Sequence, residues 1–288
     1  MEWRTTGDVA EFLAAAGDYL RRDRVSNTVI LTVTEQLRLR SPSAATGEQT
    51  YPGGPGQALF GWWTGPEGGA FMHTPPHPLL LTALSFTVAA DLAGVLADRP
   101  LSGLNANPEG AGGFSARWRA LTGGHSEVHL RQRLYRLGAL AWPDPAPAGA
   151  PRLAGTADLP LLTRWLAAFA EEVHDIGGED LAADARDRVG YGGVLLWEAG
   201  GDPVGLAATS RQVARMTRVG PVYTPPELRG RGYASAATAA VTQRALDAGA
   251  EDVLLYTDVT NPVANSIYQR LGYRPVEDRV LLSLSAAG

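Results

Sequence analysis

A proline-rich stretch divides this sequence into two parts of similar length. Between Trp142 and Pro151 the chain reads WPDPAPAGAP, with four prolines in ten residues. Proline fixes φ and lacks a backbone N–H, so this stretch cannot form the interior of a helix or a central strand. A chain of 288 residues is also long for one hydrophobic core and natural for two. We therefore predict two domains, 1–142 and 151–288, joined by a linker at 143–150.

In the second part, hydrophobic periodicity and turn residues predict alternating strands and helices. Apolar residues at i, i+3, i+4 and i+7 form one side of a helix that Asp158 is expected to cap. A Gly-Gly-Asp turn between two apolar runs indicates a hairpin. This order is typical of an α/β (α+β) domain with a mixed central sheet flanked by helices. The predicted elements are a strand at 152–154, helices at 158–172 and 179–189, strands at 193–199, 203–210 and 214–224, a helix at 232–248, a strand at 253–258, a helix at 261–271, and strands at 273–275 and 279–284.

The first part gives a weaker version of the same order, which indicates an internal duplication. The likeness lies in the sequence of elements and hardly in the residues. The predicted elements are helices at 8–22 and 27–40, a hairpin at 58–74, a strand at 78–84, a helix at 87–97, a short segment at 101–104, a helix at 109–121 and a strand at 126–137.

Two absent residue types exclude several kinds of chemistry. The sequence has no cysteine, which excludes disulfides, cysteine metal ligands and a cysteine nucleophile. All 25 basic residues are arginine, which excludes a lysine-containing P-loop and a lysine Schiff base. The net charge of −5 argues against general binding to nucleic acid or to a membrane surface. No apolar run approaches the ~18 residues of a membrane span, and the first residues lack the apolar core of a signal peptide. We expect a cytoplasmic protein.

One loop has the composition of an anion-binding site. The stretch PELRGRGYAS, Pro226 to Ser235, places two arginines and two glycines between a predicted strand and a predicted helix. The first turn of a helix has backbone N–H groups without partners and carries a partial positive charge. Glycine lets the backbone approach an anion, and arginine adds charged donors. The pattern by itself fits either a phosphate-binding loop or an ordinary basic loop before a helix.

Two motifs resemble those of the GNAT acetyltransferase superfamily. Arg229-x-x-Gly232-x-Ala234, after a strand ending in VYTPPE, resembles the family's acyl-CoA motif, (Gln/Arg)-x-x-Gly-x-(Gly/Ala). Further on, TDVTNPVANSIYQRLGYRPV resembles the second signature, an Asn after a strand and a helix with a Tyr before Gly-Phe or Gly-Tyr. The resemblance covers roughly 151–288 and includes the order of elements. It implies an acetyl-CoA-dependent N-acetyltransferase in which two neighbouring parallel strands splay apart around the pantetheine.

The resemblance also implies which residues bind acetyl-CoA. Backbone groups of Val222 and Thr224 would pair with the pantetheine, and a β-bulge near Gly220–Val222 would direct an N–H at the thioester oxygen. Backbone N–H groups of the loop and the Ser235 hydroxyl would take the pyrophosphate. No metal is expected. The cofactor-binding residues expected from the resemblance are Val222, Tyr223, Thr224, Arg229, Gly230, Arg231, Gly232, Tyr233, Ala234, Ser235, Asn261 and Tyr268.

Tyr268 is the residue we predict as the general acid. It lies beside an apolar line on helix 261–271, so the pattern alone also fits a core aromatic residue. In the family, the matching tyrosine points at the sulfur and donates a proton to the CoA thiolate. A phenol of pKa ~10 is protonated at neutral pH and can donate in this way. Asn261 is a natural helix N-cap, and in the family its counterpart also contacts the cofactor.

No residue stands out as the general base. The stretch FAEEVHDIGG lies in the region that shapes the acceptor pocket in the family, and it offers Glu172 and His174 as weak candidates. Histidine has a suitable intrinsic pKa, whereas charged residues at a helix end are usually solvated. Arg215, Arg218 and Tyr223 on the central strand are rival contacts for the acceptor. Because there is no cysteine, direct attack by the acceptor amine in a ternary complex is the simplest mechanism.

The first part lacks both motifs. LLLTALSFTVAADLAG occupies the place of the basic loop, so we predict a degenerate GNAT-like domain that has lost the cofactor site. Its Trp62, Trp63 and Phe71 are expected to wall the acceptor pocket or to form the interface between the halves. We expect a small-molecule or protein amine as acceptor, no nucleic-acid or membrane partner, and a monomer or homodimer. The alternative function is a non-catalytic acyl-CoA-binding regulatory or sensor module of the same fold.

Overall fold

The computed structural model describes residues 1–40, 57–173 and 180–287. It divides into two compact units, each considered by itself. The first unit is Met1–Arg133 together with Glu277–Gly288, and the second is Leu134–Val276. These limits differ from the predicted domain borders at the proline-rich stretch. The chain passes from one unit to the other within two long strands, His125–Leu137 and Tyr273–Ser285.

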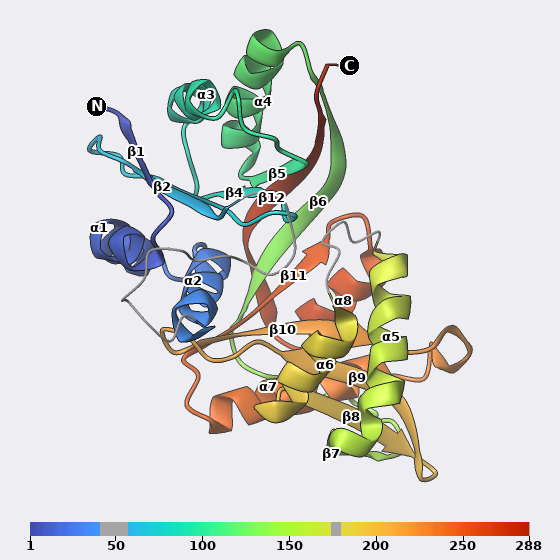
Figure 1. The fold of residues 1–288 in the computed structure, drawn as a ribbon. Coiled ribbons are helices and arrows are strands. Elements are labelled where there is room, and N and C mark those ends of the chain that lie inside the picture. Colours follow the sequence, from blue (N-terminus) through green and yellow to red (C-terminus); the bar gives the residue numbers. More distant parts are fainter. Residues whose placement is uncertain (41–56, 174–179, 288) are drawn as a thin grey trace. The chain divides into compact units, whose positions relative to one another are not determined.

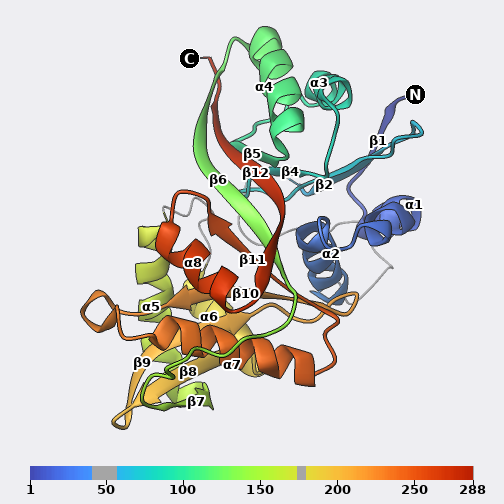
Figure 2. The ribbon, with the colours of Figure 1, turned by 180° about the vertical axis from the view of Figure 1, so that it is seen from behind.

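The second unit is a sheet with helices on both faces (Figures 1 and 2). Its strands follow the order β7-β8-β9-β10-β11-β6; β10 and β11 are parallel, and the pairs from β7 to β10 are antiparallel. Helices α5 and α6 cover one face and pack with Leu196 and Leu206, while α7 and α8 pack with Leu195 and Ala207 on the other. Neighbouring strand residues thus point to opposite faces, as the pleat requires. The elements are β7 (Ala150–Leu153), α5 (Leu159–Glu172), α6 (Leu181–Gly190), β8 (Val194–Ala199), β9 (Asp202–Thr209), β10 (Met216–Tyr223), α7 (Tyr233–Asp247), β11 (Asp252–Asp258), α8 (Pro262–Arg270) and the end of β6 (His125–Leu137).

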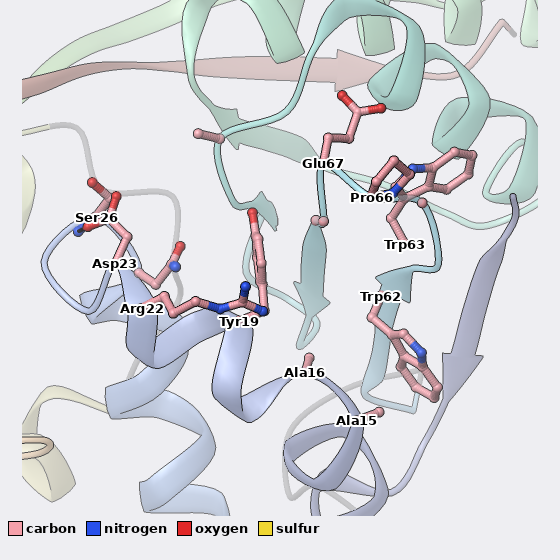
Figure 3. A pocket seen from close by; sticks show the side chains of 15 residues that line it. Ala15, Ala16, Tyr19, Arg22, Asp23, Ser26, Trp62, Trp63, Pro66 and Glu67 are labelled. Carbon is pink, nitrogen blue, oxygen red and sulfur yellow. Dashed lines mark hydrogen bonds between the residues drawn. The ribbon is translucent and has the colours of Figure 1, made fainter.

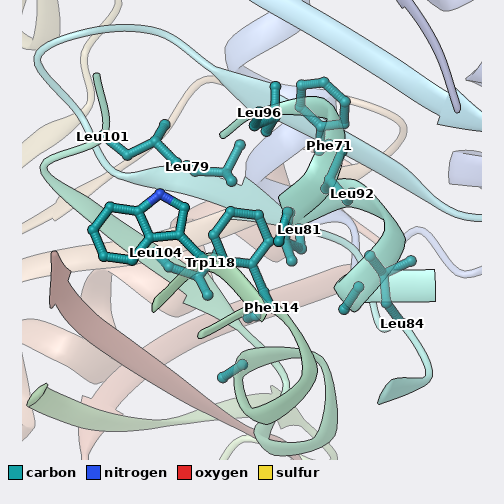
Figure 4. Packing of buried hydrophobic residues seen from close by; sticks show 14 of the residues in the cluster. Phe71, Leu79, Leu81, Leu84, Leu92, Leu96, Leu101, Leu104, Phe114 and Trp118 are labelled. Carbon is teal, nitrogen blue, oxygen red and sulfur yellow. The ribbon is translucent and has the colours of Figure 1, made fainter. Parts of the chain in front are cut away.

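The first unit has the same kind of architecture. Its strands follow the order β1-β2-β3-β4-β5-β12-β6, with β4 and β5 parallel. Helices α3 and α4 cover a core in which Phe114 and Trp118 meet leucines of the sheet (Figure 4). The elements are β1 (Trp3–Thr6), α1 (Val9–Arg22), α2 (Thr28–Arg40), β2 (Leu59–Trp63), β3 (Ala70–His73), β4 (Leu79–Leu81), α3 (Phe86–Val95), β5 (Gly103–Ala106), α4 (Pro108–Thr122), most of β6 and the end of β12 (Tyr273–Ser285).

The predicted repetition of element order is present. The series from β1 to β6 and the series from β7 to β12 both run β-α-α-β-β-β-α-β-α-β. The last strands of the two series are exchanged: β12 pairs with β5, and β6 is the neighbour of β11. Each unit therefore contains part of the closing strand of the other series, an arrangement that the order of elements could not reveal.

Three predictions of local structure were wrong. Strand β1 was missed, because its four residues carry only one buried side chain. The two strands expected at 273–275 and 279–284 are one continuous strand, β12. Pro275 is tolerated there because the pairing with β5 covers only Val280–Ser283. Asp158 does not cap α5; its carboxylate accepts the N–H of Gly155 and pairs with Arg152.

Among the residues that the structure describes, no helix is long and apolar enough to cross a membrane.

Candidate functional site

Strands β10 and β11 are parallel neighbours that separate before either strand ends. In the described part of the chain, their pairing runs from Met216 opposite Asp252 to Val219 opposite Leu255. Strand β10 continues to Tyr223, and β11 to Asp258. The splay predicted for the central strands is therefore confirmed, and it leaves backbone groups of both strands available to an extended ligand.

A β-bulge lies on β10 where the two strands separate. Val219 is opposite Thr209 and Val222 is opposite Ala207, so β10 carries one residue more than β9 over this interval. Gly220, within the interval, has φ of 146°, a value that favours glycine. A bulge re-aims the backbone groups of the strand that carries it. Its position matches the predicted bulge at 220–222.

Six consecutive backbone N–H groups are open at the start of α7. From Gly230 to Ser235, none of them donates a hydrogen bond to any described residue. Gly230 and Gly232 have φ of 75° and 82°. No atom lies within 4 Å of the place of a Cβ on Gly230, and the nearest to Gly232 is Pro147 at 3.6 Å. Glycine is required here by backbone conformation, and the N–H groups face open space at the positive end of a helix.

The two arginines of the loop are placed differently. Arg229 donates from Nε to the carbonyl oxygen of Thr224 at 2.9 Å and thereby ties the loop to the end of β10. Arg231 is exposed, and its Nη2 lies 3.4 Å from the carbonyl oxygen of Glu227. The buried Oγ1 of Thr224 has no hydrogen-bond partner among the described residues. A buried hydroxyl without a partner is unusual, and it lies where the resemblance expects the cofactor.

Tyr268 lies on α8 with its ring against the ring of Tyr273, at a centroid distance of 6.2 Å. It packs against the same hydrophobic cluster as Val222 and Tyr233. Burial raises the pKa of Tyr268 to about 12. The phenol is therefore protonated throughout the neutral range, as a proton donor must be.

Asn261 caps α8 as predicted, since its Oδ1 accepts the N–H of Ala264 at 3.0 Å. Sequence reasoning missed Asn265. Its side chain donates to the carbonyl oxygens of Asp258 and Asn261 at 2.8 and 2.7 Å, and it accepts the hydroxyl of Tyr135 at 2.9 Å. Asn265 thus fastens α8 to the end of β11 and to β6. The available signal was a polar line at i, i+4 and i+8, formed by Asn261, Asn265 and Gln269.

Of the two candidates for the general base, the structure describes Glu172 alone. Glu172 is exposed and pairs with Arg229, with 2.5 Å between Oε1 and Nη2. Tyr223 is buried beside this pair, with its ring 6.0 Å from that of Trp165 and burial as the main cause of its raised pKa. His174 lies outside the described residues. The pair places Glu172 at the phosphate-loop end of β10, not at the bulge.

A separate pocket of about 360 Å³ lies within the first unit (Figure 3). It is lined by α1, the turn after it and the β2–β3 hairpin, and it contains no residue of the two motifs. Trp62 and Trp63 line it, whereas Phe71 is fully buried in the core, so Phe71 walls no pocket. Across the described ranges, no group of three His, Asp or Glu side chains is arranged to hold a metal ion.

Comparison with known proteins agrees with this geometry. Residues 159–273 match the model of the acetyltransferase (GNAT) family. This segment contains the splayed strands, the loop and α8, and it is similar to the domain of that family. No curated protein matches the chain.

Solved structures share the fold over nearly the whole chain. An acetyltransferase of the GNAT family from Colwellia psychrerythraea is 12% identical, with a TM-score of 0.57 and 99% of each chain covered. A Drosophila protein is 13% identical, with a TM-score of 0.68 and 98% of each chain covered. A GCN5-related N-acetyltransferase from Sphaerobacter thermophilus is 15% identical, with a TM-score of 0.57, and 99% of this chain and 96% of that one are covered. At these identities the likeness shows the fold alone.

The residues present fit acetyl-CoA. The open N–H groups from Gly230 to Ser235 suit a pyrophosphate, because their glycines leave the space that an anion needs. Strands β10 and β11 separate after Val219 and Leu255, before the chain reaches this loop. An extended pantetheine can pair with the backbone there.

Proposed function

We propose that the second unit binds acetyl-CoA and transfers its acetyl group to an amine by direct attack in a ternary complex. One observation carries the proposal: β10 and β11 separate, and the loop that follows β10 presents open N–H groups at the start of α7. The acceptor is the amine of a small molecule or a protein. A cytoplasmic location, a monomer or homodimer, and a degenerate GNAT-like first half complete the proposal.

In this mechanism, the protein positions the thioester and stabilises the negative charge that develops on its oxygen and then on its sulfur. The bulge after Val219 directs a backbone N–H at the thioester oxygen, which stabilises the negative charge that develops there. The amine nitrogen forms a bond to the carbonyl carbon while the carbon–sulfur bond breaks. Tyr268 donates a hydrogen bond from its hydroxyl to the departing thiolate, and the attacking nitrogen releases a proton to a base or to water.

The pKa of Tyr268 limits how it can act. Transfer from a phenol of pKa about 12 to a thiolate with a conjugate-acid pKa near ~8.5 is uphill by roughly 5 kcal/mol. A hydrogen bond to the developing charge requires no such transfer. We therefore assign Tyr268 as a hydrogen-bond donor that stabilises the departing thiolate, and the thiolate then takes its proton from solvent.

The experiment is a measurement of CoA release from acetyl-CoA by the full-length protein. The acceptors are amines, polyamines, amino acids, aminoglycosides and peptides. Acceptor-dependent release, with the acetylated product identified by mass spectrometry, supports the proposal. Tight CoA binding by calorimetry with no release for any acceptor contradicts it.

That second outcome would support the alternative, a GNAT-fold module that binds acyl-CoA as a sensor without turnover. Two observations favour this alternative: Glu172 is held by Arg229, and burial makes Tyr268 a weaker acid. The complete loop before α7 is compatible with both functions.

A further inference from the structure

Arg218 lies on β10 immediately before the strands separate. It is opposite Leu254, one residue before the last pair of β10 and β11. Val219 next to it packs against the cluster under α7, so Arg218 points to the other face, the one that α6 covers. Its charged and polar neighbours there are Arg188 and Tyr191 around α6 and Tyr256 on β11.

In the part of the chain that the structure describes, no carboxylate pairs with the guanidinium of Arg218. Among the described residues it makes no hydrogen bond or ion pair, and its Nη1 is fully buried. The nearby carboxylates are engaged elsewhere: Asp184 with Arg188 at 2.7 Å, and Asp187 with Arg211 at 2.7 Å. Burial lowers the pKa of Arg218, and the charge of Arg188 acts in the same direction. An arginine nevertheless stays charged in a protein, so a partly buried positive charge lies beside a second one.

Arg188 is the neighbour that fixes this geometry. It donates from Nη1 to the carbonyl oxygen of Gly220 at 3.2 Å, and from Nε to Asp184 at 2.7 Å. Gly220 belongs to the bulge where the thioester is expected. The two guanidinium groups therefore stand on one face of the sheet, next to the reacting centre.

An anion bound at Arg218 would not be one of the phosphates of CoA. Those are expected at the start of α7, beyond the far end of β10. Arg218 precedes the bulge by two to four residues, a span of roughly 7–13 Å along a strand. An anionic group bound at Arg218 lies on the acceptor side of the acetyl group.

We propose that Arg218 binds a carboxylate of the acceptor, so the substrate is an amine that carries a carboxylate a few bonds from its nitrogen, as an amino acid does. This inference rests on the proposed acetyl transfer. A guanidinium matches a carboxylate with two parallel hydrogen bonds, and the negative charge of a carboxylate offsets the positive charges of Arg218 and Arg188. Binding at Arg218 holds the amine toward the bulge.

The first test uses matched acceptors and two variants. Amino acids are compared with their amides, with the corresponding amines lacking a carboxylate, and with aminophosphonates. In the wild type, the carboxylate acceptors are expected to have the highest kcat/KM. Arg218→Gln should raise their KM roughly 10–100-fold and leave the amides and the KM for acetyl-CoA unchanged. Arg244→Gln is the matched control, because Arg244 is exposed on α7, which packs on the opposite face of the sheet; it should change neither.

The second test measures binding and stability without turnover. Calorimetry of amino-acid binding to the CoA complex should show affinity in the wild type and none in Arg218→Gln, so it separates this inference from acetyl transfer itself. Arg218→Met should raise the Tm of the ligand-free protein, because it removes a partly buried charge that has no partner among the described residues. Equal use of amides and acids, a preference for phosphonates, or a lower Tm with unchanged acceptor preference would each overturn the proposal.

Discussion

Arg229 and Glu172 form an ion pair at 2.5 Å that joins the end of α5 to the loop before α7. Arg229 is also bound to the carbonyl oxygen of Thr224, so three elements of the expected cofactor site meet at one guanidinium. The pair is 47% and 42% exposed in its two side chains, which limits its contribution to stability. The ion pair matters because the Glu172 carboxylate offsets the positive charge of Arg229 in the loop before α7.

We predict that Glu172→Gln lowers the KM for acetyl-CoA and leaves kcat within about threefold of the wild type. Without the carboxylate, Arg229 is free to face the phosphates, and the effect should shrink at high salt because the pair is exposed. Steady-state kinetics at two ionic strengths measure this. A hundredfold fall in kcat would instead identify Glu172 as the general base.

Tyr268→Phe should lower kcat about 10–100-fold and leave the KM for acetyl-CoA unchanged, because only the thiolate loses a donor. Tyr273→Phe is the control. The ring of Tyr273 packs against the ring of Tyr268, but its hydroxyl is hydrogen-bonded to the hydroxyl of Thr242, at 2.6 Å in the core. Its loss should lower Tm by a few degrees with kcat retained, since a buried hydrogen bond contributes about 1 kcal/mol. Wild-type turnover in Tyr268→Phe would remove the tyrosine from the mechanism.

Asp158 should make the stability of the protein dependent on acidic pH. The hydrogen bonds from Arg152 are the main cause of its lowered pKa. A carboxyl with a lower pKa in the folded state stabilises the fold above its unfolded pKa, and this stabilisation is lost as the pH falls. Asp158→Asn should therefore reduce Tm at pH 7 and flatten the fall in Tm between about pH 5 and pH 3. Asp202→Asn, at an exposed position in the β8–β9 hairpin, should leave the profile unchanged.

The sequence predicted the elements that carry the site because their signals are local. The loop glycines and the Asn261 cap each act within a few residues, and both lie where expected. Of the apolar line of α8, Ile267 and Leu271 pack in the core, whereas Val263 is 68% exposed. The exchange of β6 and β12 depends on pairing between distant segments, which no local pattern encodes. The state of Arg218 depends on which carboxylates its neighbours already hold, and the bond between Arg188 and Gly220 spans 32 residues. Such properties of charge and contact appear only once the chain has folded.

The requirement for glycine before α7 can be separated from backbone strain by a matched pair of variants. Gly232 has φ of 82° and Gly200, in the β8–β9 hairpin, has φ of 65°. Neither position has an atom within 3.5 Å of the place of a Cβ, so alanine meets similar backbone strain and no clash at both.

Both Gly232→Ala and Gly200→Ala should lower the free energy of unfolding by about 1–2 kcal/mol, the ordinary penalty for a left-handed alanine. Only Gly232→Ala should also weaken acetyl-CoA binding, by roughly tenfold or more, because relief of the strain turns the N–H groups of the loop away from a common point. Thermal unfolding and calorimetry with CoA measure the two effects separately. Equal CoA affinity in the two variants would mean that the loop before α7 is not the phosphate site.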